Sequence, residues 1–151
     1  LSELMRMRKH RLDSVGLVAK GKVDAAANRL RDARQNEAAE QSRLDQLTEF
    51  SREFDQFLDR RDNDTLSPRQ LEEYRRFMHR LHGAVDQQSQ TAAATVDAVA
   101  SSSADWQQAS LYERALKNLI IQQNAEAARA EEKKEQAKIE AAWRQSSDPE
   151  P

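Results

Sequence analysis

Cysteine is absent from this chain of 151 residues, and glycine and proline occur only three times each. Without cysteine the chain has neither disulfide bonds nor a thiol nucleophile, which fits a reducing compartment. With so little glycine and proline, it lacks the turns that a compact domain of this length needs. Aromatic residues make up only 5% of the chain, so the sequence does not supply a thick hydrophobic core.

No charge of one sign dominates, and no long apolar run is present. The formal net charge of −2 gives no electrostatic case for nucleic acid as the main partner. The longest strongly apolar run, Leu119-Ile120-Ile121, is far shorter than a membrane span. The first residues are basic, but no apolar stretch follows them, so we do not expect a secretory signal here.

Most residues of the chain are strong helix formers. Ala, Glu, Gln, Arg, Leu and Lys are abundant, and charged residues make up 33% of the chain. So polar a composition is also compatible with disorder, but the scarcity of helix breakers favours long helices. Only residues 60–68 have turn composition. We therefore predict a single domain with helices over 1–61 and 68–145, a turn over 62–67 and a disordered tail over 146–151.

The start of the second predicted helix carries several signals. Ser67 is a preferred N-cap residue, Pro68 suits the first helical position, and Gln70 completes a capping box. Leu66 and Leu71 flank the cap at the spacing of a hydrophobic staple. The second helix is therefore predicted to begin at Pro68.

Both predicted helices carry a heptad pattern of apolar and small residues. In the first helix its two rows are Val23, Leu30, Glu37, Leu44, Ser51 and Leu58, and Met5, Leu12, Ala19, Ala26, Ala33, Glu40, Leu47 and Phe54. In the second they are Leu71, Met78, Val85, Ala92, Val99 and Trp106, and Tyr74, Leu81, Gln88, Thr95, Ser102, Ala109 and Leu116. A sustained period of 3.5 residues is typical of a coiled coil. Because the connecting turn is short, we predict an all-α fold, an antiparallel two-helix coiled coil that forms a long α-hairpin and a rod.

Pairing the helices outward from the turn predicts how evenly the hairpin is packed. Large residues such as Phe54 and Tyr74 meet near the turn, which we expect to be the well-packed end. In the middle, Glu37 and Glu40 lie opposite Ala92, and because buried carboxylates are costly we expect a loosely packed, solvated zone. Residues beyond about 128 have no partner in the hairpin, so the end of the second helix is predicted to be lone or frayed.

The sequence offers little for catalysis or metal binding. A two-helix coiled coil has no concave pocket in which polar groups converge, so we expect neither an enzyme nor a cofactor. His79 and His82 are three residues apart on one helix, which a metal site could use, but an exposed pair is the commoner explanation. Asp62-Asn63-Asp64 has the opening of a calcium loop without its central glycine and closing glutamate, which favours a helix stop.

Two surface features favour protein binding instead. The heptad rows form the predicted seam between the helices, and Tyr74, Leu81 and Val85 belong to it. Phe77 and Ala84 flank this seam, so the apolar strip is wider than one helix covers. Residues 1–22 are the one skewed patch of charge, with six basic residues against two acidic ones. This patch either aids solubility or contacts an acidic protein surface or anionic lipid, and its charge alone leaves both open.

The order of these elements resembles the FliJ family of the bacterial flagellar type III export apparatus. The first helix carries Gln46-Leu47-x-x-Phe50-x-x-x-Phe54, where the family tends to have L-x-x-Y-x-x-x-Y. After a short polar turn, the second helix carries Tyr74-Arg75-Arg76-Phe77-x-x-x-Leu81-x-x-Ala84-Val85-x-x-Gln88, close to the family's Y-x-x-F-x-x-x-L-x-x-A-I. The similarity runs from about residue 12 to about residue 125.

The resemblance implies a non-enzymatic protein with several protein partners. Family members are antiparallel two-helix rods, similar to the central stalk of rotary ATP synthases, that associate with the hexameric export ATPase, the membrane export gate and export chaperones. The resemblance places the gate contacts on Phe77, Leu81, Ala84 and Gln88, the last of which is often His in relatives. By analogy with the stalk, the ATPase would meet the basic end of the rod, which carries Arg6, Arg8, Lys9 and Arg11.

The same resemblance implies a cytoplasmic protein, held peripherally at the inner face of the cytoplasmic membrane through its partners. Three other interpretations stay open at this point. One is the corresponding stalk of a virulence-type secretion injectisome, which shares this architecture. A generic scaffold coiled coil that dimerises through its exposed stripe is the second. An enzyme is the third and the least favoured.

Overall fold

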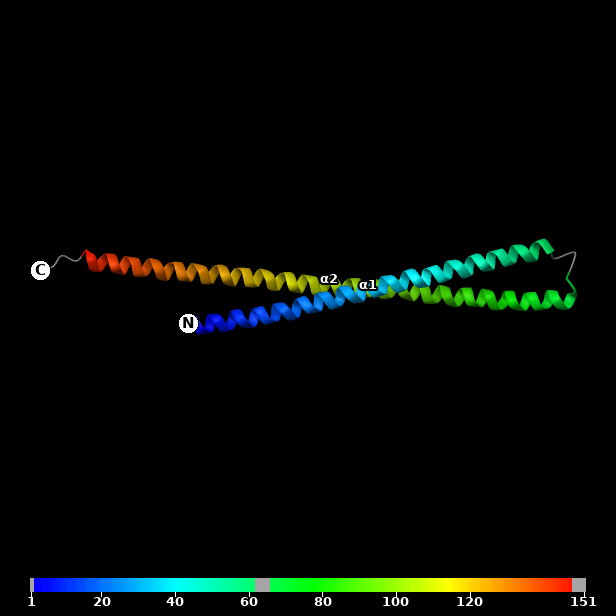
Figure 1. Ribbon diagram of the computed structural model, residues 1–151, viewed down its shortest axis with the longest axis horizontal. Helices are drawn as coiled ribbons and strands as arrows, with labels where there is room; N and C mark the ends of the chain where they lie inside the picture. Colours follow the sequence, from blue (N-terminus) through cyan, green and yellow to red (C-terminus); the bar gives the residue numbers. More distant parts are fainter. Residues whose placement is uncertain (1, 62–65, 148–151) are drawn as a thin grey trace. The chain divides into compact units, whose positions relative to one another are not determined.

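The computed structural model describes residues 2–61 and 66–147, and these form two long helices (Figure 1). Helix α1 spans Ser2–Arg61 and helix α2 spans Pro68–Ser146. The helices pack against each other in opposite directions, and the described residues contain no strand. The predicted all-α antiparallel hairpin is therefore confirmed. Most of the predicted turn, residues 62–65, and the end of the predicted tail, residues 148–151, lie outside the described residues.

The predicted capping box fixes the start of α2. The Ser67 Oγ accepts a hydrogen bond from the Gln70 backbone N–H at 3.3 Å, and the Ser67 backbone N–H donates to Oε1 of Gln70 at 3.2 Å. The first helical hydrogen bond runs from the N–H of Leu71 to the carbonyl of Ser67 at 3.0 Å. Two backbone donors at the helix start thus gain partners, and α2 begins at Pro68.

The chain divides into two compact units, each an antiparallel helix pair. Unit 1 contains α1 up to Asp24 and α2 from Gln107 onward, and unit 2 runs from Ala25 to Trp106. The expectation of a single domain stays a prediction. None of the described helical segments is long and apolar enough to cross a membrane.

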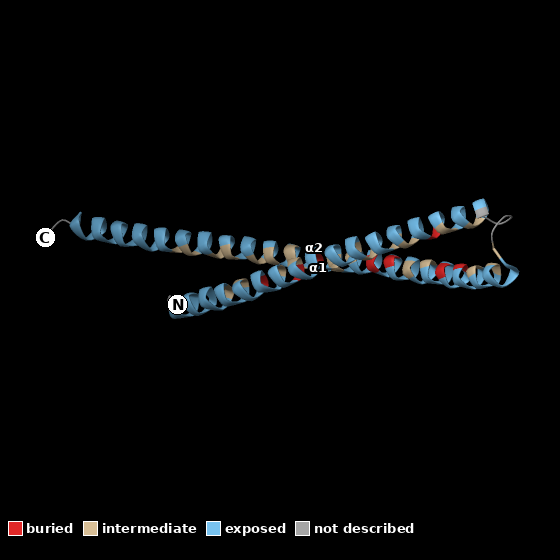
Figure 2. Cartoon of the chain, turned by 45° about the vertical axis from the view of Figure 1, so that its right-hand side comes forward, coloured by how far each residue is buried: buried red, intermediate tan, exposed pale blue. Residues whose placement is uncertain are grey.

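A narrow stripe of covered residues runs along one face of each helix (Figure 2). On α1 all the predicted seam positions from Leu12 to Leu58 are buried or half-buried, whereas Met5 is exposed. On α2 the same spacing begins at Leu71 and continues to Ala130, beyond the predicted rows. Its added positions are Glu113, Ile120, Gln123, Ala127 and Ala130. The heptad prediction is confirmed, with Trp106 as the exception on α2.

The middle of the hairpin is where the expectation of loose packing is wrong. Ala92 is only 5% exposed and Thr95 is buried as well, with its hydroxyl donating to the carbonyl oxygen of Ala92 at 2.6 Å. The Glu40 side chain is only 12% exposed. Small side chains let two helix backbones approach closely, and the Thr95 hydroxyl finds its partner within its own helix. This zone is therefore closed rather than solvated.

Near the turn, the large residues meet as predicted but are only partly covered. The ring centroids of Phe54 and Tyr74 are 5.8 Å apart. Phe54, Tyr74, Leu58 and Leu71 are nevertheless all half-buried rather than buried. Two helices alone cannot enclose rings of this size, so the turn end keeps apolar surface in contact with solvent.

Candidate interaction surfaces

Four phenylalanines in unit 2 form a cluster that we call the aromatic surface: Phe50, Phe54, Phe57 and Phe77. Phe54 lies at its centre, with ring centroids 6.3 Å from Phe50, 6.1 Å from Phe57 and 5.0 Å from Phe77. The contact with Phe77 is edge-to-face, the arrangement that ring quadrupoles favour. Phe50, Phe57 and Phe77 are all exposed, Phe77 by 37%. Both helices therefore contribute to one contiguous, solvent-facing apolar patch.

The four residues implied in gate contact differ in accessibility. Phe77 and Ala84 are exposed. Leu81 is only 8% exposed because it belongs to the seam. Gln88 is half-buried, and its amide donates to Glu40 of α1. Phe77 and Ala84 are thus the two of these four side chains that the closed hairpin leaves exposed.

Charged pairs lie beside the aromatic surface. Arg52 donates two hydrogen bonds to the Glu49 carboxylate, at 2.5 and 3.1 Å. The hydrogen bond from Arg52 lowers the pKa of the Glu49 carboxyl. The Nε2 of His82 lies 3.4 Å from Oδ2 of Asp55. His82 thus faces a carboxylate of α1. Among the described residues, no group of three side chains that could bind a metal ion occurs.

The basic end lies in unit 1 and has a mixed lining. The residues Met5, Arg6, Arg8 and Lys9 of α1 border a shallow groove of about 310 Å³. The opposite side, from α2, consists of Gln123, Asn124, Glu126, Ala127, Glu131 and Lys134. Arg11 is exposed but does not line the groove. Two glutamates therefore offset part of the positive charge, so this surface offers both signs to a partner.

Unit 1 also exposes large apolar side chains that the sequence analysis did not single out. They include Leu4, Met7, Leu17, Val18, Leu111, Tyr112 and Ile121. A second groove of about 260 Å³ joins Val15, Val18 and Ala19 of α1 to Tyr112 of α2. Apart from Ala19, these apolar residues stand outside the heptad rows, and this off-seam position is the signal that could have found them.

The last turns of α2 have no covered face. Every described residue from 131 to 147 is exposed, including Ile139 and Trp143. The prediction of an unpartnered helix beyond about residue 128 agrees with this exposure. The segment remains helical through Ser146.

These surfaces define a class of protein: an antiparallel helical hairpin with exposed apolar and charged strips. The chain belongs to the FliJ family, because the family model described as "Flagellar FliJ protein" matches residues 7–147. Members of this family are structural, non-enzymatic components of the flagellar type III export apparatus. No curated protein and no solved structure matches this chain.

Proposed function

We propose that this protein is the stalk of the flagellar export apparatus, binding the hexameric export ATPase through unit 1 and the export gate through the aromatic surface. The observation that carries the proposal is the aromatic surface, where Phe50, Phe57 and Phe77 stay exposed around Phe54. Leaving such rings in water is unfavourable, and a partner that covers them gains their burial free energy. The family match favours the flagellar system over an injectisome.

The gate contact would centre on Phe77 and include Ala84, with Phe50 and Phe57 enlarging it from α1. Leu81 supports the contact from within the seam rather than touching the partner, because it is buried. Gln88 likewise acts within the hairpin through Glu40. The role of α2 in this contact is thus to present an apolar strip of fixed shape.

The ATPase contact would use the exposed basic and apolar residues of unit 1. Arg6, Arg8, Lys9 and Arg11 are all exposed, so their charges are available to acidic side chains of the ring. Leu17 and Leu111 add apolar area that the helix pair itself leaves uncovered. The proposal also includes export chaperones as binding partners. It places the protein peripherally at the cytoplasmic face of the membrane, where its partners hold it. The mechanism is positional, since a stiff helix pair transmits changes in the ring to the gate.

Binding to the purified cytoplasmic domain of the export gate tests the first contact. Phe77→Ala should weaken binding by about tenfold or more, because it removes a central aromatic anchor. Val96→Ala is the matched control, since Val96 is also an exposed apolar residue of α2 outside the aromatic surface. Equal binding by both variants, with helicity unchanged in circular dichroism, contradicts the gate contact.

ATP hydrolysis by the purified export ATPase tests the second contact. The protein should stimulate hydrolysis at stoichiometric amounts, and a variant with Arg6, Arg8, Lys9 and Arg11 changed to Gln should stimulate less. Because charge attraction is screened by salt, the difference should shrink at high ionic strength. Absence of any stimulation or co-sedimentation by the unaltered protein would leave the generic scaffold as the better account.

A further inference from the structure

Trp106 interrupts the covered stripe of α2. It stands at a heptad position, seven residues after Val99 and seven before Glu113, and both of those side chains are half-buried. Its indole is nevertheless 37% exposed. Tryptophan carries one of the largest apolar surfaces of any side chain, so its exposure within a seam leaves a substantial area available for burial by a partner.

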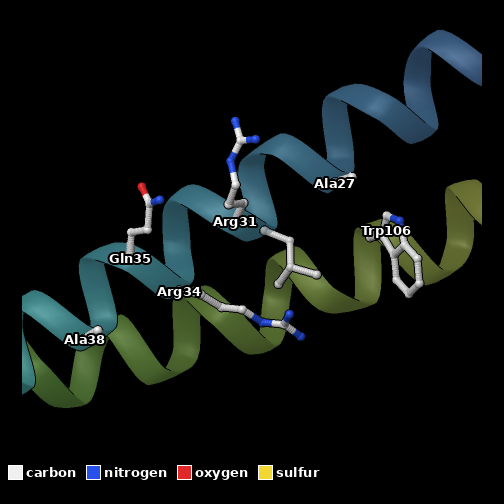
Figure 3. A pocket seen from close by; sticks show the side chains of 7 residues that line it. Ala27, Arg31, Arg34, Gln35, Ala38 and Trp106 are labelled. Carbon is white, nitrogen blue, oxygen red and sulfur yellow. The ribbon is translucent and has the colours of Figure 1, made fainter.

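A groove in unit 2 starts at this indole and follows α1 (Figure 3). Its volume is about 540 Å³, and it is lined by Ala27, Leu30, Arg31, Arg34, Gln35, Ala38 and Trp106. From Ala27 to Ala38, α1 rises about 16 Å, or three turns. The alanines at either end have no side chain beyond Cβ to obstruct an approaching backbone. The groove therefore suits an elongated occupant about three helical turns long.

Two arginines give the groove its charge. In Figure 3, Arg34 extends toward Trp106, whereas Arg31 points away from α2 while still lining the groove. Among the described residues, neither guanidinium forms an ion pair, although Arg43, Arg52 and Arg76 of the same unit are each paired with a glutamate. A guanidinium that becomes covered needs a carboxylate partner. The occupant must therefore carry acidic groups as well as apolar ones.

We propose that this Trp106 groove binds an acidic amphipathic helix of a partner protein. Apolar side chains spaced i, i+3/i+4 and i+7 on the partner contact the Trp106 indole, and flanking carboxylates bind Arg31 and Arg34. The groove shares no residue with the aromatic surface or with unit 1. It is an additional interaction site, and it does not depend on the proposed gate or ATPase contacts.

A nucleotide or another phosphate ligand fits this groove less well. Phosphate sites on helices use the free backbone N–H groups of a helix N-terminus. Residues 27–38 lie in the interior of α1, where those groups are engaged in the helix itself. The length of the groove, its apolar lining residues and its position in the middle of α1 together favour a helix as the occupant.

Fluorescence of the full chain with Trp143→Phe tests the proposal, because Trp106 is then the only indole. The probe is a synthetic helical peptide of about 14 residues, long enough for four turns, with leucines at heptad spacing flanked by glutamates. Its matched control carries glutamine in place of each glutamate. We expect the acidic peptide to shift the Trp106 emission to the blue, to protect it from acrylamide quenching and to bind about tenfold more tightly than the control.

Matched variants assign the effect to the groove. Arg31→Gln together with Arg34→Gln should lower the affinity for the acidic peptide to that of the glutamine peptide, and circular dichroism should be unchanged because both side chains are exposed. Arg29→Gln, an exposed arginine outside the groove, should have no effect. Equal affinities for the two peptides, or no response of Trp106 to either, overturns the proposal.

Two further outcomes also overturn it in favour of another occupant. A saturable response of Trp106 to ATP without any response to the peptides assigns the groove to a phosphate ligand. A blue-shifted emission in the protein alone that is lost on dilution, with dimers in sedimentation that Trp106→Ala abolishes, assigns it to a second copy of the chain.

Discussion

The side-chain amide of Gln88 on α2 donates hydrogen bonds to Glu40 on α1, at 2.6 Å to Oε2 and at 3.0 Å to the backbone carbonyl oxygen. The other carboxylate oxygen of Glu40 accepts from Arg43 at 2.7 Å. Both oxygens of a nearly covered carboxylate therefore have partners, which is how the seam accommodates a glutamate.

Replacing Gln88 by alanine should destabilise the hairpin. The change removes both hydrogen bonds and leaves one carboxylate oxygen of Glu40 without its partner, which costs about 1–2 kcal/mol in the free energy of unfolding. Urea denaturation followed by circular dichroism measures this. Gln87→Ala, at an exposed neighbour, should change stability by less than about 0.5 kcal/mol. Additive effects in a double-mutant cycle of Gln88→Ala and Glu40→Ala would show that the two side chains are not coupled.

A larger side chain at Ala92 should open the closed zone of unit 2 around Ala92 and Thr95. Ala92→Leu forces extra volume between two helices and should cost about 1–3 kcal/mol. Ala93→Leu is the matched control, because Ala93 is exposed and leucine is nearly as good a helix former as alanine. Thermal unfolding of the two variants compares them directly. Similar stabilities would mean that the helices are not close at Ala92.

Loss of the capping box should weaken the start of α2. Ser67→Ala removes the hydroxyl that accepts from the Gln70 N–H, and such changes cost about 1 kcal/mol. Ser67→Asp, which keeps an acceptor at the same position, should retain most of the stability. Urea denaturation of both variants provides the test, and a loss of equal size in the aspartate variant contradicts a capping role.

Gly21→Ala should stabilise the chain. Gly21 lies inside α1, its φ is not positive, and an added Cβ would meet no atom within 4 Å. Alanine at such a helical site gains up to about 1 kcal/mol, because it restricts the unfolded chain and favours the helix. An increase in melting temperature with unchanged helicity is the expected result. A decrease would indicate that this part of α1 is less helical in solution.

The heptad spacing predicted the seam from Leu12 to Leu58 and from Leu71 onward, because the period alone decides which face of each helix is covered. It did not predict that the middle of the hairpin is closed. That depends on the sum of the facing side chains, and the closed zone at Ala92 and Thr95 follows from their small size. The exposure of Trp106 likewise depends on what α1 offers opposite it.

For the interaction surfaces, the sequence was enough to predict exposure where a residue lies clearly outside the seam. Phe77 and Ala84 were predicted to flank it, and both are exposed. The partner of Gln88 could not be predicted, because a hydrogen bond between two helices requires the register and the rotation of both. The exposed apolar residues of unit 1, such as Leu17 and Leu111, lie at positions outside the heptad rows. To predict this surface, the apolar residues at those positions must be counted as well.

The capping box at Ser67 also bears on the order in which the helices come together. Residues that pair across the hairpin are 27 positions apart for Asp55 and His82 and 48 apart for Glu40 and Gln88. Since closing a longer loop costs more entropy, pairing should nucleate beside the cap and propagate away from it. Unit 1, which holds both ends of the chain, then closes last and reopens first, so its paired state has the shortest lifetime in the molecule.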